Sequence, residues 1–325
     1  DRTDILQVLR KQNRRVASHA VSEQYLGTVA ELPDRRRQFR KDVLRLTAPS
    51  LMDDAIMPPS PGVLPQQIAT ITFNVAGLDI YAPSAYDRSV FFVGPCFPPQ
   101  AQPDAQQPAD DEVIAWMDKM HAEGRRVVCI NMGTIYYYQP QDYAHMVQAL
   151  HMIHEQNPNV AFLWKIAQRP KHVQNIPSEE EAALPPYVRR LSWIPSMTAV
   201  MEHPALAVMM HHGGGNSLNE CLAYGIPQFC ISQWVDTHDI GLCIRHSGVG
   251  LWSEYSPDFV PEDICSQLLQ LVEDKDHTFR HTALSWKLKT QQAGGTKFAA
   301  DLIQSYVTDY TYAGGSSKAP MPHAM

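Results

Sequence analysis

Short apolar segments alternate with helical patterns over the second half of the chain, and this alternation limits the possible folds more than any other feature. Six apolar segments predict buried strands: residues 127–132, 160–164, 191–193, 206–210, 228–231 and 249–252. Helices are predicted between most of them: after Gly133-Thr134 through about Gln156, 197–203, 216–224 and 238–246. Strands that alternate with helices form a parallel sheet covered on both faces. The sequence therefore predicts an α/β fold with a doubly wound parallel sheet.

The flanking segments indicate how the chain divides. Helical patterns occur before residue 50, a proline loop at 57–62, strand-like runs at 69–74 and 90–93, and three more helical patterns after residue 261. Residues 98–110 are rich in Pro, Gln and Ala, as linkers are. We expect five parts: a remnant of an N-terminal domain (1–97), a linker (98–110), the sheet domain (111–275), C-terminal helices (276–310) and a disordered tail (311–325).

Composition and charge make several classes of partner poor candidates. The 325 residues are 44% hydrophobic with a net charge of −7, so we expect no nucleic-acid partner and no membrane. The basic cluster at 35–41 is interpreted as a solvated helix face. No apolar run approaches the ~20 residues of a membrane helix. The six cysteines form no Cys-x-x-Cys pair, which is typical of reduced cysteines in a cytoplasmic protein.

A glycine loop joins the fourth predicted strand to the next helix. Residues 206–210 suit a buried strand, the glycines at 213–215 cannot continue it, and Ser217 precedes Glu220 by the spacing of a helix capping box. Glycines let the backbone approach an anion, and free amides at a helix start attract negative charge. His212 adds a donor that titrates near neutral pH. The loop is interpreted as a phosphate site, although a tight turn with a capped helix also explains these residues.

The residues around this loop resemble the signature of the family 1 UDP-sugar glycosyltransferases. That signature runs Trp-x-Pro-Gln, His-Pro, His-x-Gly-Trp-Asn-Ser-x-x-Glu, Gly-x-Pro and Asp-Gln. The chain matches it in register at Trp193, Pro195, His203, Pro204, His212, Gly214, Asn216, Ser217, Glu220, Gly225, Pro227 and Asp236. A weaker likeness extends over residues 70–310. The resemblance implies the GT-B fold, in which two Rossmann-like domains face each other across a cleft. The second binds the UDP-sugar and the first binds the acceptor.

The resemblance also implies a role for each matched residue. Trp193 would stack on the uracil, since an indole is a flat platform, and the Ile194 backbone would hydrogen-bond the edge of the base. Glu220 would accept from the ribose hydroxyls, and Asp236 would bind hydroxyls of the sugar. The diphosphate would be held by Thr134, His212, Gly214, Asn216 and Ser217. Neighbouring positions complete the donor-binding candidates: Gly133, Ser196 and Thr237.

Three positions depart from the family pattern. Ser196 replaces a glutamine, Gly215 replaces a tryptophan, and Thr237 replaces a glutamine that usually helps to read the sugar. The choice between glucose, another hexose and a glucuronic acid is therefore open. The longer glycine run predicts a more mobile phosphate loop.

No catalytic base is identified in the chain. The family's first domain opens with a strand and a loop that carries a catalytic histidine, and the start of this chain does not show that pattern. His19 lies in a polar helical context and is not assigned as the base. We therefore expect the chain to lack most of the acceptor-binding domain, either because it is truncated or because another chain supplies that domain.

The resemblance implies an inverting transferase that moves a hexose, with glucose as the expected sugar, from a UDP-sugar to a hydroxyl of a small lipophilic acceptor. Phenols, sterols and other secondary metabolites are the expected acceptors, and the acceptor oxygen would displace UDP in line. The donor is a substrate, so no cofactor and no metal are expected. The Asp-x-Asp sequence at 274–276 is interpreted as a solvated turn.

Two other functions stay open. A hydrolase metal site could use the ligand side chains of His211, His212, Asp236, His238 and Asp239. It would leave the rest of the signature, such as Trp193 and Glu220, unexplained. A non-catalytic UDP-sugar-binding module, or the donor-binding half of a split transferase, would explain the signature as well as an enzyme does.

Overall fold

The computed structural model describes residues 70–78, 90–96, 108–179 and 181–312. The chain divides into two compact units, residues 1–70 and residues 71–325, and the description below concerns the second. Several predictions lie outside the described residues: the helices before residue 50, the loop at 57–62, the basic cluster at 35–41, His19, residues 98–107 of the linker and the tail after residue 312. The domain boundaries stay predictions.

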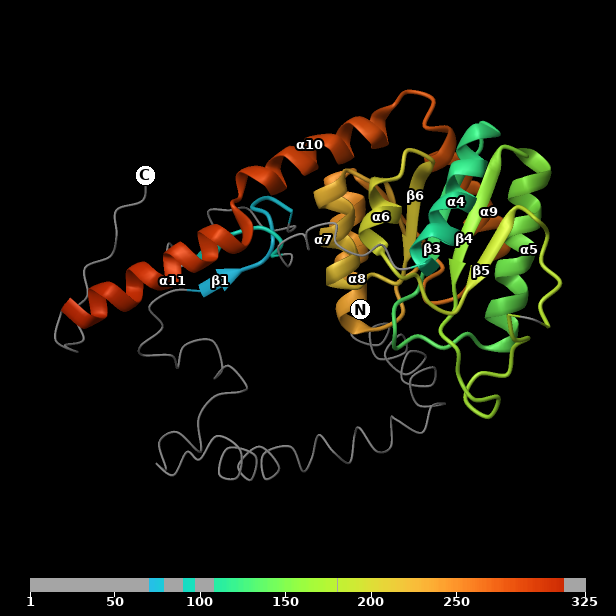
Figure 1. Ribbon diagram of the computed structural model, residues 1–325, viewed down its shortest axis with the longest axis horizontal. Helices are drawn as coiled ribbons and strands as arrows, with labels where there is room; N and C mark the ends of the chain where they lie inside the picture. The colour runs from blue at the N-terminus through green and yellow to red at the C-terminus, as the bar shows by residue number, and fades with distance from the viewer. Residues whose placement is uncertain (1–69, 79–89, 97–107, 180, 313–325) are drawn as a thin grey trace. The chain divides into compact units, whose positions relative to one another are not determined.

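A parallel sheet of six strands forms the centre of this unit (Figure 1). The strands are β3 (Arg126–Asn131), β4 (Val160–Lys165), β5 (Val188–Leu191), β6 (Leu206–His211), β7 (Gln228–Cys230) and β8 (Gly250–Trp252). Their order across the sheet is β5-β4-β3-β6-β7-β8, and every pair is parallel. The predicted α/β fold is confirmed. The order reverses between β3 and β6, which is where doubly wound sheets open a crevice for ligands.

Helices connect the strands and continue beyond the last one. They are α4 (Pro108–Ala122), α5 (Pro140–Gln156), α6 (Met197–Glu202), α7 (Gly215–Tyr224), α8 (Val235–Ser247), α9 (Pro261–Glu273), α10 (Thr278–Gln292) and α11 (Gly295–Tyr312). A second sheet pairs β1 (Thr70–Thr72) with β2 (Val90–Phe92). No helix among the described residues is both long enough and apolar enough to cross a membrane.

Both faces of the central sheet are buried because successive side chains of a strand point to opposite faces. Val128 and Ile130 of β3 belong to a core that includes side chains of α5 and α9. Val127 and Cys129 belong to a second core that includes side chains of α4, α6 and α7. Burial raises the pKa of the Cys129 thiol to about 12, so this cysteine is a structural side chain and no nucleophile.

Residues 71–78 and 90–96 pack beside the C-terminal helices. The amide of Gly295 donates to the carbonyl of Val93 at 2.7 Å, which joins the start of α11 to the end of β2. The rings of Phe91 and Tyr306 meet edge to face with centroids 6.5 Å apart. Leu78 lies in a third core cluster with side chains of α7, α8 and α10.

Three element boundaries differ from the predictions at the carboxyl edge of the sheet. β5 ends at Leu191, so Trp193 lies in the loop beyond the strand. α5 begins only at Pro140, because proline suits the first turn of a helix, and a loop follows Thr134. α8 begins at Val235, which puts Asp236 in its first turn. α4, whose buried Val113, Met117 and Met120 have helical spacing, is not predicted from the sequence.

The predicted capping box at Ser217 and Glu220 is wrong. Gly214 is the N-cap of α7, and no side chain caps this helix, so Ser217 is already its third residue. The physical reason is that Gly215 already has a helical backbone, so the helix begins one turn before the position that the side-chain pattern indicates. The predicted solvated turn at 274–276 is also wrong in part: the buried carboxylate of Asp274 accepts from the amides of Phe279 and Arg280 at the start of α10.

Candidate functional site

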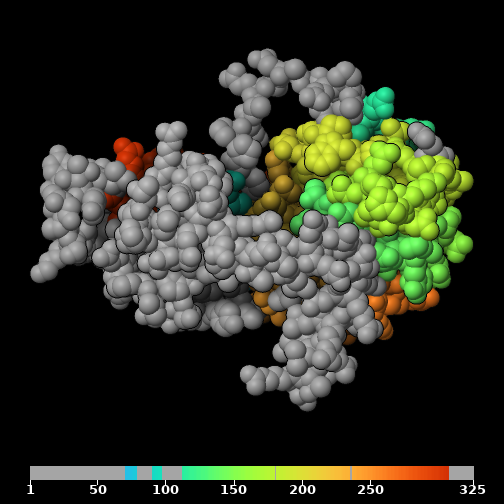
Figure 2. All heavy atoms as spheres, turned by 90° about the horizontal axis from the view of Figure 1, so that it is seen from below, coloured from blue at the N-terminus to red at the C-terminus, as the bar shows by residue number. Residues whose placement is uncertain are grey.

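The segments at the ends of five strands lie along the carboxyl edge of the sheet, in the order in which the strands pair. Across the edge they carry Trp193 after β5, Lys165 at the end of β4, Gly133 after β3, His212 after β6 and Asp236 after β7. The edge is at the bottom of the sheet in Figure 1, and Figure 2 views it from below, with the segments after β3, β4 and β5 in green to yellow-green at the surface.

The His212 ring sits between two glycines. A β-carbon on Gly133 would lie 2.6 Å from Cε1 of His212, and a β-carbon on Gly214 would lie 2.7 Å from the same atom. Gly133 also has a φ of +82°, a conformation that other residues rarely adopt. Both glycines are therefore required for the imidazole to stand between the β3 and β6 loops, and the two loops form one surface.

His212 is neutral at pH 7 and has an unsatisfied polar atom. Burial, with a smaller contribution from the positive charge of Lys165, lowers its pKa to about 4. Its Nδ1 is buried and has no hydrogen-bond partner among the described residues. The Trp234 ring lies beside it with centroids 5.1 Å apart. A buried polar atom without a partner is costly, so the ring is suited to receive a polar ligand.

A second histidine, His211, positions the glycine loop through a hydrogen bond to its backbone. Nδ1 of His211 accepts from the amide of Gly213 at 3.0 Å, so the proton of the neutral ring is on Nε2, which donates to Oε1 of Gln228 at 2.9 Å. Burial lowers the pKa of His211 to about 4, with a smaller contribution from His212 and against the effect of the Gln228 hydrogen bond. His211 is thus a positioning residue for the loop.

The start of α7 offers backbone amides to this space. Gly214 supplies no side chain to cap them, and Asn216 in the first turn is exposed. Ser217 is buried. Free amides and the positive end of the helix dipole bind anions without a metal ion. The backbone amides of the predicted anion site are present at the start of α7, although the predicted side-chain cap is absent.

Lys165 links the centre of the edge to Trp193. Its Nζ donates to the carbonyl of Gly133 at 3.1 Å and to Oδ1 of Asn131 at 3.4 Å, and the same oxygen accepts from the amide of Gly133 at 3.0 Å. Nζ also lies 5.1 Å from the centroid of the Trp193 ring, within cation–π range. Burial, and secondarily Arg169, lowers the pKa of Lys165.

Trp193 has an uncovered side chain beside a firmly held backbone. It is 62% exposed, whereas the next residue, Ile194, is 5% exposed and belongs to the core under α4 and α6. Among the described residues, no hydrogen bond uses the main chain of Ile194. An exposed indole next to free backbone groups suits a planar ring with polar edges.

Two predicted donor contacts have other partners. Oγ of Ser196 accepts from the amide of Ala199 and caps α6. Thr237 is 1% exposed: its hydroxyl donates to the carbonyl of Trp234 at 2.6 Å and accepts from the amides of Gln233 and Trp234. Short hydroxyl side chains bond readily to nearby backbone, which is why these two fix their loops. Asp236, one residue earlier, is exposed on the same turn.

Glu220 lies on α7, one and a half turns from the glycine loop. Burial raises the pKa of its carboxyl group, and among the described residues no hydrogen-bond donor or cation pairs with it. The carboxylate of Glu220 is therefore free to accept hydrogen bonds from a ligand.

Thr134, at the start of the β3 loop, is exposed, and its carbonyl accepts from Arg169 at 2.7 Å.

Comparison with known proteins identifies relatives. A family model for the C-terminal domain of erythromycin biosynthesis protein CIII-like proteins matches residues 171–297. Erythritol-mannosyl-transferase 1 of Mycosarcoma maydis is 26% identical over 272 residues, which covers 65% of this chain and 43% of that protein. Limonoid UDP-glucosyltransferase of Citrus unshiu is 27% identical over 234 residues, which covers 67% of this chain and 44% of that protein.

A solved structure shares the fold. The crystal structure of UDP-glucose: anthocyanidin 3-O-glucosyltransferase in complex with UDP matches with a TM-score of 0.56 at 22% identity, over 74% of this chain and 52% of that chain. The GT-B type of the predicted fold is thereby confirmed. These matches agree with the resemblance of the sequence to the UDP-glycosyltransferases. It spans less than half the length of the two relatives named above.

The side chains considered for a hydrolase metal site are not arranged to hold a metal ion. His211 uses both ring nitrogens within the fold, and Nδ1 of His238 bonds to Oγ of Ser232 at 2.6 Å. Among the residues that the structure describes, no three His, Cys, Asp or Glu side chains are grouped so that they could hold a metal ion.

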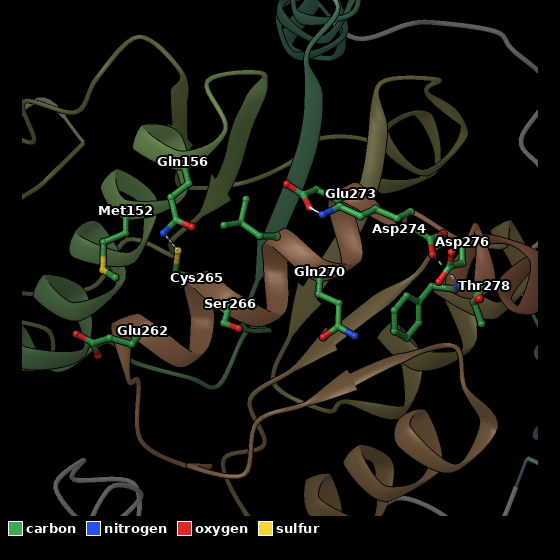
Figure 3. Close-up of a pocket in the computed structure, with 13 residues that line it drawn as sticks. Met152, Gln156, Glu262, Cys265, Ser266, Gln270, Glu273, Asp274, Asp276 and Thr278 are labelled. Carbon is green, nitrogen blue, oxygen red and sulfur yellow. Dashed lines mark hydrogen bonds and ion pairs between the residues drawn. The ribbon is translucent and has the colours of Figure 1, made fainter.

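One cavity of the described unit lies away from this edge. It has a volume of 830 Å³ and lies between α5, α9 and the turn before α10 (Figure 3). Its lining includes four acidic residues: Glu262, Glu273, Asp274 and Asp276. An acidic lining repels a diphosphate, and none of the predicted site residues contributes to it. This cavity is therefore a poor candidate for a nucleotide site.

The sequence reasoning missed three residues of the site: Lys165, Trp234 and the His211 partner Gln228. A lysine at the carboxyl end of a fully buried strand is an available signal, because charged side chains are rarely buried without a purpose. The pairing of Gln228 with His211 has no local signal, since the two residues stand on neighbouring strands, 17 positions apart.

Proposed function

We propose that the chain binds a UDP-sugar along the carboxyl edge of the sheet and serves the transfer of its hexose to an acceptor hydroxyl. One observation carries this proposal: the order of the loops is the order of the parts of a nucleotide sugar. An aromatic platform at β5 is followed by the phosphate loops at β3 and β6, and then by a carboxylate at β7.

In this proposal Trp193 stacks on the base, and the main chain of Ile194 bonds the base edge. The free carboxylate of Glu220 accepts from the ribose hydroxyls. The diphosphate rests on the α7 amides beside the orphaned Nδ1 of His212. Asp236 reaches the sugar hydroxyls.

The proposed reaction is a single in-line displacement. The acceptor oxygen forms a bond to the anomeric carbon while the bond from that carbon to the diphosphate oxygen breaks, and the electron pair leaves with UDP. The acceptor proton passes to a general base, which by the family resemblance is a histidine of the first domain. The α7 start and His212 stabilise the charge that develops on the leaving diphosphate, and no metal ion takes part.

The sugar and the acceptor are proposed only as classes. One relative is named an erythritol mannosyltransferase and another a limonoid glucosyltransferase, so we propose a hexose donor and a hydroxylated small molecule as the acceptor. A panel of UDP-glucose, UDP-galactose, UDP-glucuronic acid and nucleotide-mannose donors with phenols, sterols and polyols would identify both.

Titration calorimetry with UDP, GDP and ADP tests the donor site. We expect UDP to bind with one site per chain and the two purine nucleotides to bind more weakly. Failure of UDP to bind, or equal affinity for all three nucleotides, would refute the UDP site.

The alternative is a non-catalytic UDP-sugar-binding module or the donor half of a split transferase. It is favoured by the fact that the assigned site residues in the described part of the chain all serve the donor. UDP release should be assayed for this chain and for a version extended at its N-terminus. If neither form releases UDP while the chain still binds it, the module is the better description.

Replacement of Trp193 with alanine is expected to weaken UDP binding by about 5- to 150-fold, because a base stacked on an aromatic ring contributes roughly 1–3 kcal/mol. Phenylalanine at this position should retain much of the affinity. Calorimetry of both variants measures the effect, and Phe73→Ala, at an exposed aromatic outside the central sheet, is the control. Unchanged affinity in Trp193→Ala would contradict the role of the platform.

Replacement of Glu220 with glutamine is expected to reduce the preference for UDP over 2′-deoxy-UDP. The carboxylate accepts from ribose hydroxyls, so removing its charge matters most for the ligand that has both of them. The affinity ratio of the two nucleotides is measured for both proteins, with helix content by circular dichroism as the control. A fall in thermal stability with an unchanged ratio would instead indicate a purely structural carboxylate.

A further inference from the structure

We propose that Lys165 is a further donor-binding residue, whose ammonium group supplies a fixed positive charge to the diphosphate between Trp193 and His212. The inference rests on the proposed function and adds a residue that the signature does not include.

The fold fixes Lys165 at the centre of the edge. It is the last residue of β4, directly opposite Asn131 on β3 and Leu191 on β5. Lys165 is 5% exposed, so its side chain has little freedom. A residue in this position stands next to the switch point of the sheet, where ligands of doubly wound folds bind.

The charge of this ammonium group is not balanced by the protein. Its two hydrogen-bond acceptors are neutral, the carbonyl of Gly133 and the amide oxygen of Asn131. Among the described residues, no carboxylate lies within ion-pair distance of it. An ammonium group has three donors, so one is left over. A buried cation without an anion is unfavourable, and a bound anion would relieve that cost.

The surroundings of the ammonium group show which part of the ligand it meets. On one side its Nζ lies 5.1 Å from the Trp193 ring centroid. On the other side it bonds to Gly133, the residue whose Cα faces the His212 ring. Its positive charge also helps to lower the pKa of His212, which requires that the two groups be close. A ligand that extends from Trp193 to His212 passes Lys165 where its phosphates lie.

A purely structural role is the competing explanation, because Lys165 also holds the Gly133 turn. The two roles differ in what they recognise. A charge contact acts on phosphate and leaves uridine binding unchanged. A structural brace shapes the whole edge and affects uridine and UDP alike.

The test compares Lys165→Met and Lys165→Arg with the wild type by calorimetry, using UDP, UMP and uridine. We expect Lys165→Met to bind UDP at least about 10-fold more weakly, with uridine affinity within about 2-fold, because one charged hydrogen bond is lost. Lys165→Arg should restore part of the UDP affinity. The exposed Lys171, which pairs with Glu181 at 3.1 Å, is the matched control as Lys171→Met. UDP affinity that is unchanged, or weakened by the same factor as uridine affinity, would overturn the proposal.

Two further measurements distinguish failure of the proposed function from failure of the role of Lys165. If the wild type does not bind UDP, the proposed function fails; if it binds UDP and Lys165→Met binds equally well, only the role of Lys165 fails. If circular dichroism shows that Lys165→Met is unfolded, Lys165→Gln is measured, since glutamine keeps a donor for the Gly133 carbonyl and removes the charge. The expected and contradicting results are then the same.

Discussion

Replacement of Gly213 with alanine is expected to abolish UDP binding and to destabilise the fold, whereas the same change at Gly215 leaves both properties unchanged. Gly213 has a φ of +87°, and a β-carbon there would lie 2.6 Å from the carbonyl oxygen of Thr237. A left-handed conformation and a clash with backbone together cost about 2–5 kcal/mol. The displaced backbone belongs to the β6 loop and to the first turn of α8, which form the phosphate and sugar ends of the site.

The other two glycines of the run serve as internal controls. Gly214 has an ordinary extended backbone, and the three atoms nearest to a β-carbon there would all belong to the His212 ring, the closest at 2.7 Å. Gly214→Ala should therefore displace the imidazole and weaken UDP binding with little loss of stability. Gly215 has nothing within 4 Å of a β-carbon and lies at the start of α7, where alanine is favoured.

Calorimetry with UDP and denaturant unfolding of the three variants measure these effects side by side. The expected results are loss of both properties, loss of affinity alone, and no loss. Wild-type affinity in Gly213→Ala would show that the loop tolerates the strain and that the phosphate does not depend on its shape. A Gly215→Ala variant as damaged as Gly213→Ala would contradict the assigned N-cap of α7.

The sheet could be predicted from the sequence because its strands are buried on both faces. Segments such as 160–164 are then continuous apolar runs, and the turn residues between them mark the changes of element. The positions of Trp193, His212 and Asp236 at one edge follow directly from parallel strands. These arguments need only local patterns and one rule of topology.

Side-chain partners could not be predicted because they depend on contacts between loops. Ser196 and Thr237 occupy family contact positions, yet their hydroxyl groups find nearer partners in their own turns. The capping pattern at Ser217 is a valid local signal, but α7 begins one turn earlier, with Gly214 as its N-cap. The contact of Lys165 with the Gly133 loop depends on the pairing of β4 with β3, which brings its ammonium group to the Gly133 carbonyl.

Acidification from pH 7 to pH 5 is expected to lower the free energy of unfolding by about 2 kcal/mol through His211 alone. Burial lowers the pKa of His211 from 6.5 to about 4 in the folded chain. Between these values the unfolded chain binds the proton and the folded chain does not, so unfolding becomes more favourable as the pH falls. Above the unfolded value neither state is protonated, and the contribution is fully present.

Denaturant unfolding at pH 7 and pH 5 checks this expectation in the wild type and in His211→Gln. Glutamine cannot be protonated, so the variant should lose about 2 kcal/mol less on acidification, even if it is less stable at pH 7. His246→Gln, at an exposed histidine of α8, controls for the loss of a histidine as such. Because Nδ1 of His211 must stay unprotonated to accept from Gly213, parallel pH curves would mean that other contacts hold the glycine loop.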